Sequence, residues 1–194
     1  MSAPAPLRLF VAVAPPAPAR DSLAAAVAPL REAPGAPRWG DPARWHLTLL
    51  FLGAVPAALL EPLTAAVGSA VAGTPPAVLR LAGAGRFGSA RRPQVFWAGL
   101  DGDVAVVTAL AGRLARAARG LGLPVEDRPF RPHLTLGRWH PRRPADGDLP
   151  ARLAGYRGPD WTLTEVALVR STAGRHETLG TFATVTTRTP PERA

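Results

Sequence analysis

The tetrapeptide His-Leu-Thr-Leu occurs twice in this chain, at residues 46–49 and again 87 positions later at residues 133–136. Each copy lies in an apolar stretch that is typical of a β-strand. The spacing is close to half of the 194-residue length. An internal duplication is therefore expected, in which each half of the chain contributes one copy of the same strand.

Strand geometry places the polar residues of each copy together. Side chains two residues apart share a face, so His46 and Thr48 point one way while the leucines point the other, and the same holds for His133 and Thr135. If the two halves pack about a pseudo-twofold axis, these faces meet across one cleft. That cleft would hold two imidazoles and two hydroxyls.

Two imidazoles favour in-line displacement at phosphorus. With an unperturbed pKa near 6.5, one histidine accepts a proton from the nucleophile while a second, protonated histidine donates one to the leaving oxygen. Threonine hydroxyls and a nearby arginine bind the non-bridging oxygens. This chemistry requires no metal and no cofactor.

Other interpretations of the repeat are open. A single histidine on a buried strand is commonly a core residue, and threonine is simply a good strand former. Packing alone gives no reason to place histidine twice on an apolar strand, where each needs a polar partner. A metal site is disfavoured because neither copy has a flanking carboxylate, third histidine or cysteine. We expect His140 and His176 to be surface residues.

The composition excludes several protein classes. Without cysteine, the chain has no disulfide scaffold and no thiolate chemistry, and 47% apolar residues argue against disorder. The net charge is +9, and every basic residue is arginine, which we attribute to GC-rich coding. The surplus favours an anionic partner. No apolar run is long enough for a membrane span, and no export signal is evident, so a cytoplasmic monomer without membrane contact is expected.

The hydrophobic pattern predicts alternating strands and helices. Strands are expected at residues 7–13, 44–55, 77–82, 94–100 and 130–138, and a closing hairpin at 161–170 and 178–186. Helices are expected around residues 18–30, 60–71 and 107–121, with a short one near 149–153, a cationic loop at 83–93 carrying Arg86, Arg91 and Arg92, and a frayed tail at 187–194. Many links are too short for repeated parallel crossovers, so the fold class is α+β with antiparallel sheets.

The sequence resembles the two-histidine phosphoesterase superfamily, which is defined by two His-x-Thr-x motifs. It is most similar to the bacterial RNA 2′,3′-cyclic phosphodiesterases, once named 2′-5′ RNA ligases. The resemblance rests on LRLFVAVAPP, RWHLTLLFLGAV, RPQVFWAGL, LGLPVEDRPFRPHLTLGR and LTEVALVRS, in the family's order. It implies a single domain, residues 1–194, built from two lobes, each an antiparallel sheet with outer helices. One motif is in residues 44–55 and the other in 130–138, with the catalytic cleft between the lobes.

By motif position, the resemblance implies that His46 is the proton donor and His133 the proton acceptor, with Thr48 and Thr135 binding phosphate. The implied reaction is hydrolysis of a 2′,3′-cyclic phosphate on RNA or a nucleotide to a 2′-phosphate. Run backwards with a 5′-hydroxyl RNA, it would form a 2′-5′ linkage. The alternatives are a nucleotide- or RNA-binding module without turnover, and a phosphodiesterase for other cyclic phosphates or 2′-5′ oligonucleotides.

Further site residues are predicted around the motifs. Arg138 is a candidate phosphate ligand, although ideal alternation places it on the face opposite His133 unless the strand bulges. Arg131 has the correct parity; either arginine could instead be solvated. Phe10, Trp45 and Phe51 are candidates for stacking on a base or for core packing. His176 stands where the family has a tyrosine.

Overall fold

The structure, a computed structural model, describes residues 5–185 as three α-helices and nine strands. The helices are α1 (Ala17–Val27), α2 (Leu60–Ala72) and α3 (Val104–Gly120). The strands are β1 (Leu7–Val13), β2 (Arg38–Trp39), β3 (Leu47–Val55), β4 (Val78–Gly88), β5 (Pro93–Gly102), β6 (His133–Arg138), β7 (Trp161–Thr162), β8 (Glu165–Thr172) and β9 (Arg175–Ala183). A 3-10 helix spans Leu149–Leu153.

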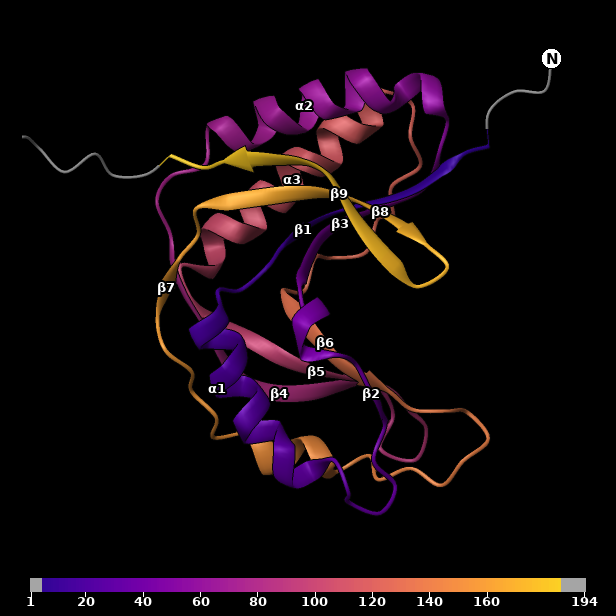
Figure 1. Cartoon of the computed structure of the whole chain (residues 1–194), viewed down its shortest axis with the longest axis vertical. Coiled ribbons are helices and arrows are strands. Elements are labelled where there is room, and N and C mark those ends of the chain that lie inside the picture. Colours follow the sequence, from indigo (N-terminus) through magenta and orange to yellow (C-terminus); the bar gives the residue numbers. More distant parts are fainter. Residues whose placement is uncertain (1–4, 186–194) are drawn as a thin grey trace, which may run out of the picture.

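All strand pairings are antiparallel, in the order β7-β4-β5-β6-β3-β1-β8-β9, with β2 added beside β6. The two repeat strands, β3 and β6, are central neighbours, and they meet at a single register pair, Leu47 with Leu134. The expected α+β class with two lobes is confirmed. The sheets of the two lobes are joined through this pair into one curled sheet (Figure 1).

Each helix buries one apolar stripe, as its spacing predicts. The buried residues of α3 include Val107, Leu110 and Leu114. Helices α2 and α3 cover the half that contains β3, β8 and β9, whereas α1 lies against β4 in the other half (Figure 1). Helix α3 follows β5 but packs against β3, so it crosses from one half to the other. The two halves therefore share one core.

The β4–β5 hairpin departs from the prediction. The expected loop at residues 83–93 is strand up to Gly88, and only residues 89–92 form the turn. Arg86 consequently lies in β4, where it donates a hydrogen bond to the Gly147 carbonyl at 2.7 Å and pairs with Asp148 at 3.6 Å. Its guanidinium is bound by the neighbouring segment, which corrects the expectation that Arg86 lies in a loop.

The closing hairpin forms from β8 and β9, but the start of its expected first strand, at residues 161–162, is the separate strand β7, which pairs with β4 instead. Strand β2 was not expected, and the short helix forms at Leu149–Leu153 as predicted. The predicted tail at 187–194 lies outside the described residues. No helix within residues 5–185 has the length and apolar character required to cross a membrane.

Candidate active site

The two repeat strands carry matching bulges. On β6, Trp97 of β5 pairs with Thr135 and the adjacent Phe96 pairs with Gly137, so Leu136 is an extra residue. On β3, Ala12 of β1 pairs with Thr48 and the adjacent Val11 pairs with Leu50, so Leu49 is the extra residue. A bulge reverses the alternation beyond it. The residues three positions after each threonine, Phe51 and Arg138, are thereby turned to the same side as the threonines.

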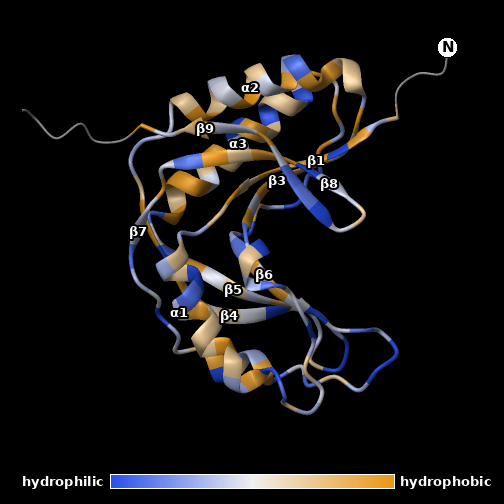
Figure 2. Cartoon of the chain, viewed as in Figure 1, coloured by the Kyte–Doolittle hydropathy of each residue, from blue (hydrophilic) through white to orange (hydrophobic). Residues whose placement is uncertain are grey.

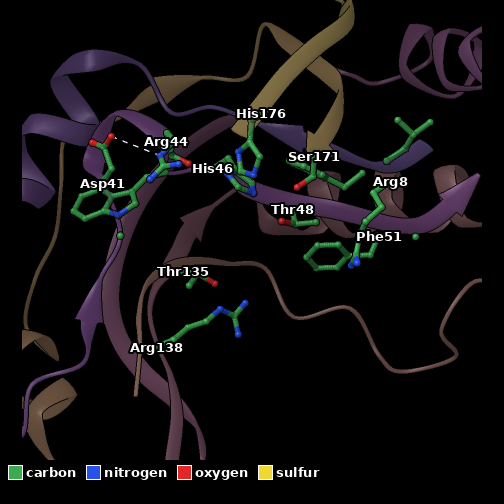
Figure 3. A pocket seen from close by; sticks show the side chains of 15 residues that line it. Arg8, Asp41, Arg44, His46, Thr48, Phe51, Thr135, Arg138, Ser171 and His176 are labelled. Atoms are coloured by element: carbon green, nitrogen blue, oxygen red, sulfur yellow. Dashed lines mark hydrogen bonds and ion pairs between the residues drawn. The ribbon is translucent and has the colours of Figure 1, made fainter. Parts of the chain in front are cut away.

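A cleft opens on this side of the sheet. Two adjoining cavities of ≈ 530 and ≈ 580 Å³ share four lining residues: Thr48, Phe51, Thr135 and Arg138. His46 lines the first cavity and His133 the second. Figure 3 shows Thr135 and Arg138 facing the His46 and Thr48 side of the first cavity. The cleft therefore brings together both histidines and both threonines of the repeat.

The two imidazoles are held in the same way. His46 Nδ1 donates to the carbonyl of Arg44 at 2.8 Å, and His133 Nδ1 donates to the carbonyl of Arg131 at 2.6 Å. Because a carbonyl only accepts, Nδ1 carries a proton in both rings. The Nε2 atom of each neutral ring is left with its lone pair for proton transfer.

Burial shifts both histidines toward the neutral form. Desolvation lowers the pKa of His46 and of His133, and in each case the hydrogen bond to the backbone carbonyl opposes this effect. A positive neighbour lowers each pKa further: His176 acts on His46, and Arg138 acts on His133. In the absence of an anion, both rings favour the form in which Nε2 accepts a proton.

His176 is a third imidazole at the site. It lies on β9 with its ring edge-on to His46, the centroids 5.3 Å apart, and edge-on to Phe10 at 5.1 Å. Figure 3 shows it beside His46. Burial and the nearby Arg44 lower the pKa of His176. His176 is exposed, as the sequence predicts, but the β8–β9 hairpin also places it over the cleft, which the sequence did not indicate.

The arginines differ in their placement. Arg138 lines both cavities because of the bulge at Leu136, and within residues 5–185 no carboxylate pairs with it. Arg131 is exposed and lines the second cavity. Its counterpart Arg44 lines the first cavity, donates to the Gly174 carbonyl at 2.8 Å and lies 3.6 Å from Asp41 (Figure 3).

The three aromatic residues predicted to stack on a base differ in exposure. Trp45 is 3% exposed and packs in the core, because its parity matches that of Leu47 rather than that of His46. Phe10 is 5% exposed, and its ring stacks on His46 at 5.0 Å. Both residues border the first cavity, but the burial of their rings favours the core-packing alternative over base stacking. Phe51 is 65% exposed and lines both cavities.

Sequence reasoning missed two contributors besides His176. Arg44 stands two residues before His46, as Arg131 stands two residues before His133, so extending the repeat upstream would have found it. Phe87 contacts His133 edge-on at 4.8 Å and had no sequence signal, since only the β4–β5 pairing brings it there. Within residues 5–185, no group of three or more His, Cys, Asp or Glu residues is arranged to hold a metal ion.

Comparison with known proteins is consistent with this geometry. An RNA 2′,3′-cyclic phosphodiesterase of Geobacillus stearothermophilus is 32% identical over 74% of this chain and 46% of its own length, so the chain spans about half of that relative. Another from Thermus thermophilus is 34% identical over 85% of this chain and 82% of its own. The crystal structure of E. coli LigT complexed with 3′-AMP matches with a TM-score of 0.75 and 28% identity, covering 93% of this chain and 99% of LigT. The family model described as the 2′-5′ RNA ligase superfamily matches residues 19–175, and the chain belongs to that superfamily.

Proposed function

We propose that the protein hydrolyses 2′,3′-cyclic phosphates at the ends of RNA or on nucleotides, leaving a 2′-phosphomonoester. The observation that carries this proposal is the paired anchoring of His46 and His133. Each imidazole donates Nδ1–H to the carbonyl of an arginine two residues earlier and keeps Nε2 for proton transfer in the same cleft. The names of the G. stearothermophilus and T. thermophilus relatives support the same reaction.

The reaction needs one proton acceptor and one proton donor. His133 Nε2 removes a proton from water, the water oxygen bonds to phosphorus, and the bond from phosphorus to O3′ breaks. His46, protonated at Nε2, gives its proton to O3′, so the product carries a 2′-phosphate and a free 3′-hydroxyl. The assignment of donor and acceptor follows the order of the two motifs in the superfamily.

The negative charge of the bound substrate favours the protonated form of His46. Although burial lowers the pKa of His46, a bound phosphodiester anion favours the imidazolium and raises that pKa again. Substrate binding therefore favours protonation of His46, the proposed proton donor. Arg138 and the hydroxyls of Thr48 and Thr135 face the same space, where they stabilise the charge that grows on the non-bridging oxygens.

The exposed ring of Phe51 provides the base contact. It lies between the two cavities, at the position in the first repeat that Arg138 occupies in the second. A base stacked on an exposed aromatic ring contributes about 1–3 kcal/mol without selecting one base. E. coli LigT was solved with the nucleotide 3′-AMP, which fits a site that accepts a nucleoside.

The proposal is tested with a nucleoside 2′,3′-cyclic monophosphate in excess EDTA, with 2′- and 3′-phosphate products resolved by chromatography. The wild type should form the 2′-phosphate, and His46→Ala and His133→Ala should each lower kcat by about 10² to 10⁴-fold. His140→Ala is the matched control, because that exposed histidine lies outside the cleft. A wild type that binds the cyclic nucleotide without converting it would indicate a binding module, and formation of the 3′-phosphate would contradict the assigned roles.

A further inference from the structure

Six arginines gather at the end of the α1 half, away from the two histidines. They lie in three segments that contact one another, residues 31–38, 89–92 and 140–148. Asp146 N donates to the Gly35 carbonyl at 2.9 Å, and a Cβ atom on Gly147 would collide with the carbonyl oxygen of Ala90. In Figure 2 the loops at this end of the molecule are predominantly hydrophilic. We call these residues the loop arginines: Arg31, Arg38, Arg91, Arg92, Arg142 and Arg143.

The loop arginines lack carboxylate partners, a feature they share with eight further arginines of the described residues, but they alone lie together at this end of the molecule. Seven others, including Arg44 and Arg86, lie within ion-pair distance of a carboxylate. No loop arginine has such a carboxylate in the part of the chain that the structure describes. Arg31 lies over the ring of Trp39, 5.9 Å from its centroid, a contact that does not neutralise its charge. The charge of the loop arginines is therefore available to an external anion.

One of the loop arginines lies beside the cleft. Arg38 of β2 lies directly opposite Arg138 of β6, which lines both cavities of the site. Like charges placed opposite each other on neighbouring strands destabilise a sheet. A second phosphate, next to the one at Arg138 and outside the cleft, would relieve that repulsion by binding Arg38. Beyond Arg38 lies a further cavity of ≈ 740 Å³. Its charged lining consists of Arg31, Arg38 and Arg143 against one carboxylate, Glu32, so the arginines outnumber the acid.

We infer that the loop arginines bind the phosphate backbone of single-stranded RNA on the 5′ side of the reacting nucleotide. The inference rests on the proposed function, since a 2′,3′-cyclic phosphate terminates the 3′ end and the rest of the strand must leave the cleft. A group of arginines without carboxylate partners, adjoining Arg138 through Arg38, suits a polyanion and binds the backbone without reading the bases. Only an oligonucleotide extends far enough to contact the loop arginines. A cyclic mononucleotide lies entirely within the cleft and does not reach them.

The test compares two substrates in three proteins. The substrates are a nucleoside 2′,3′-cyclic monophosphate and a single-stranded RNA of about ten nucleotides with a 2′,3′-cyclic end, a length in the usual range for one binding site. The proteins are the wild type, Arg38→Gln/Arg143→Gln, and a control, Arg20→Gln/Arg116→Gln, which removes the same charge from positions outside both the cleft and the loops.

For Arg38→Gln/Arg143→Gln, kcat/KM on the oligonucleotide should fall by about tenfold at low salt, while kcat/KM on the mononucleotide stays at the wild-type value. The slope of log kcat/KM against log salt should become shallower by about 1.4 on the oligonucleotide only, the value for two lost phosphate contacts. Equal losses on both substrates, no loss on the oligonucleotide, or an equal loss in the control would overturn the inference.

Failure of the proposed function gives a different result. If the wild type converts neither substrate, the hydrolase proposal fails and the surface is tested by fluorescence anisotropy with the same oligonucleotide. Weaker binding by Arg38→Gln/Arg143→Gln than by the wild type and the control then supports the surface. Equal affinity of all three proteins overturns it.

Discussion

Leu47 and Leu134, which hold the same position in the two copies of the repeat, pair with each other across β3 and β6. An antiparallel pair of equivalent residues lies on the local twofold relation between the two copies. The preceding residues, His46 and His133, are therefore placed symmetrically on the two sides of this pair. The fold uses one contact to join the lobes and to set the two imidazoles about the cleft.

Truncation of this leucine pair should loosen the junction of the lobes. Leu47 is 1% exposed and Leu134 is 0% exposed, so Leu47→Ala and Leu134→Ala should each lower the free energy of unfolding by about 2–5 kcal/mol. Because the two side chains belong to paired residues, the double variant should deviate from additivity by about 0.5–3 kcal/mol. Urea unfolding of the four proteins measures this coupling, and strict additivity would show that the two sites respond independently.

The maximum of kcat/KM should fall at a pH below the ordinary histidine pKa of about 6.5. Burial lowers the pKa of both His46 and His133. The acceptor must be deprotonated and the donor protonated, so lowering both pKa values moves the rising and the falling limb to lower pH. The profile of kcat should lie at higher pH, since bound phosphate raises both pKa values. Steady-state rates on a cyclic mononucleotide measure both curves, and coincident profiles with maxima above about pH 7 would contradict the assignment.

Replacement of His176 should move one limb of that profile. A positive charge on His176 lowers the pKa of His46, whereas the charged neighbour acting on His133 is Arg138. His176→Phe should therefore shift the falling limb, which reports the donor, to higher pH and leave the rising limb in place. His140→Phe is the control because His140 lies outside the cleft, and an unchanged falling limb in His176→Phe would show that His176 does not act on His46.

Replacement of Arg138 should lower catalysis, whereas replacement of Arg86 should lower stability. Arg138→Gln removes a charge from both cavities of the site and should lower kcat by about 10²-fold with little change in thermal stability. Arg86→Gln removes the hydrogen bond to the Gly147 carbonyl and should cost about 1–3 kcal/mol of stability, while the folded protein keeps its kcat. Thermal unfolding and steady-state rates distinguish the two, and a reversed pattern would place Arg86 rather than Arg138 at the phosphate.

Local pattern was sufficient for most of the elements and for the central residues of the site. The spacing of Leu110 and Leu114 predicts α3, and alternation within each tetrapeptide places His46 with Thr48 and His133 with Thr135. Alternation also assigns Trp45 to the core face with Leu47, an inference available from the sequence. These features depend only on side-chain periodicity within one helix or strand.

Only the tertiary structure shows the features of the site that depend on pairing between distant strands. The bulge at Leu136 turns Arg138 into the cleft, and it exists only in the register of β5 against β6. His176 reaches His46 because β9 folds back on β8, 130 residues along the chain, and Arg86 is engaged because Gly147 packs against its strand. Register and long-range packing follow from the whole core rather than from any single segment. The repeat alone therefore determined the two imidazoles, and the folded sheet decided which charges and rings surround them.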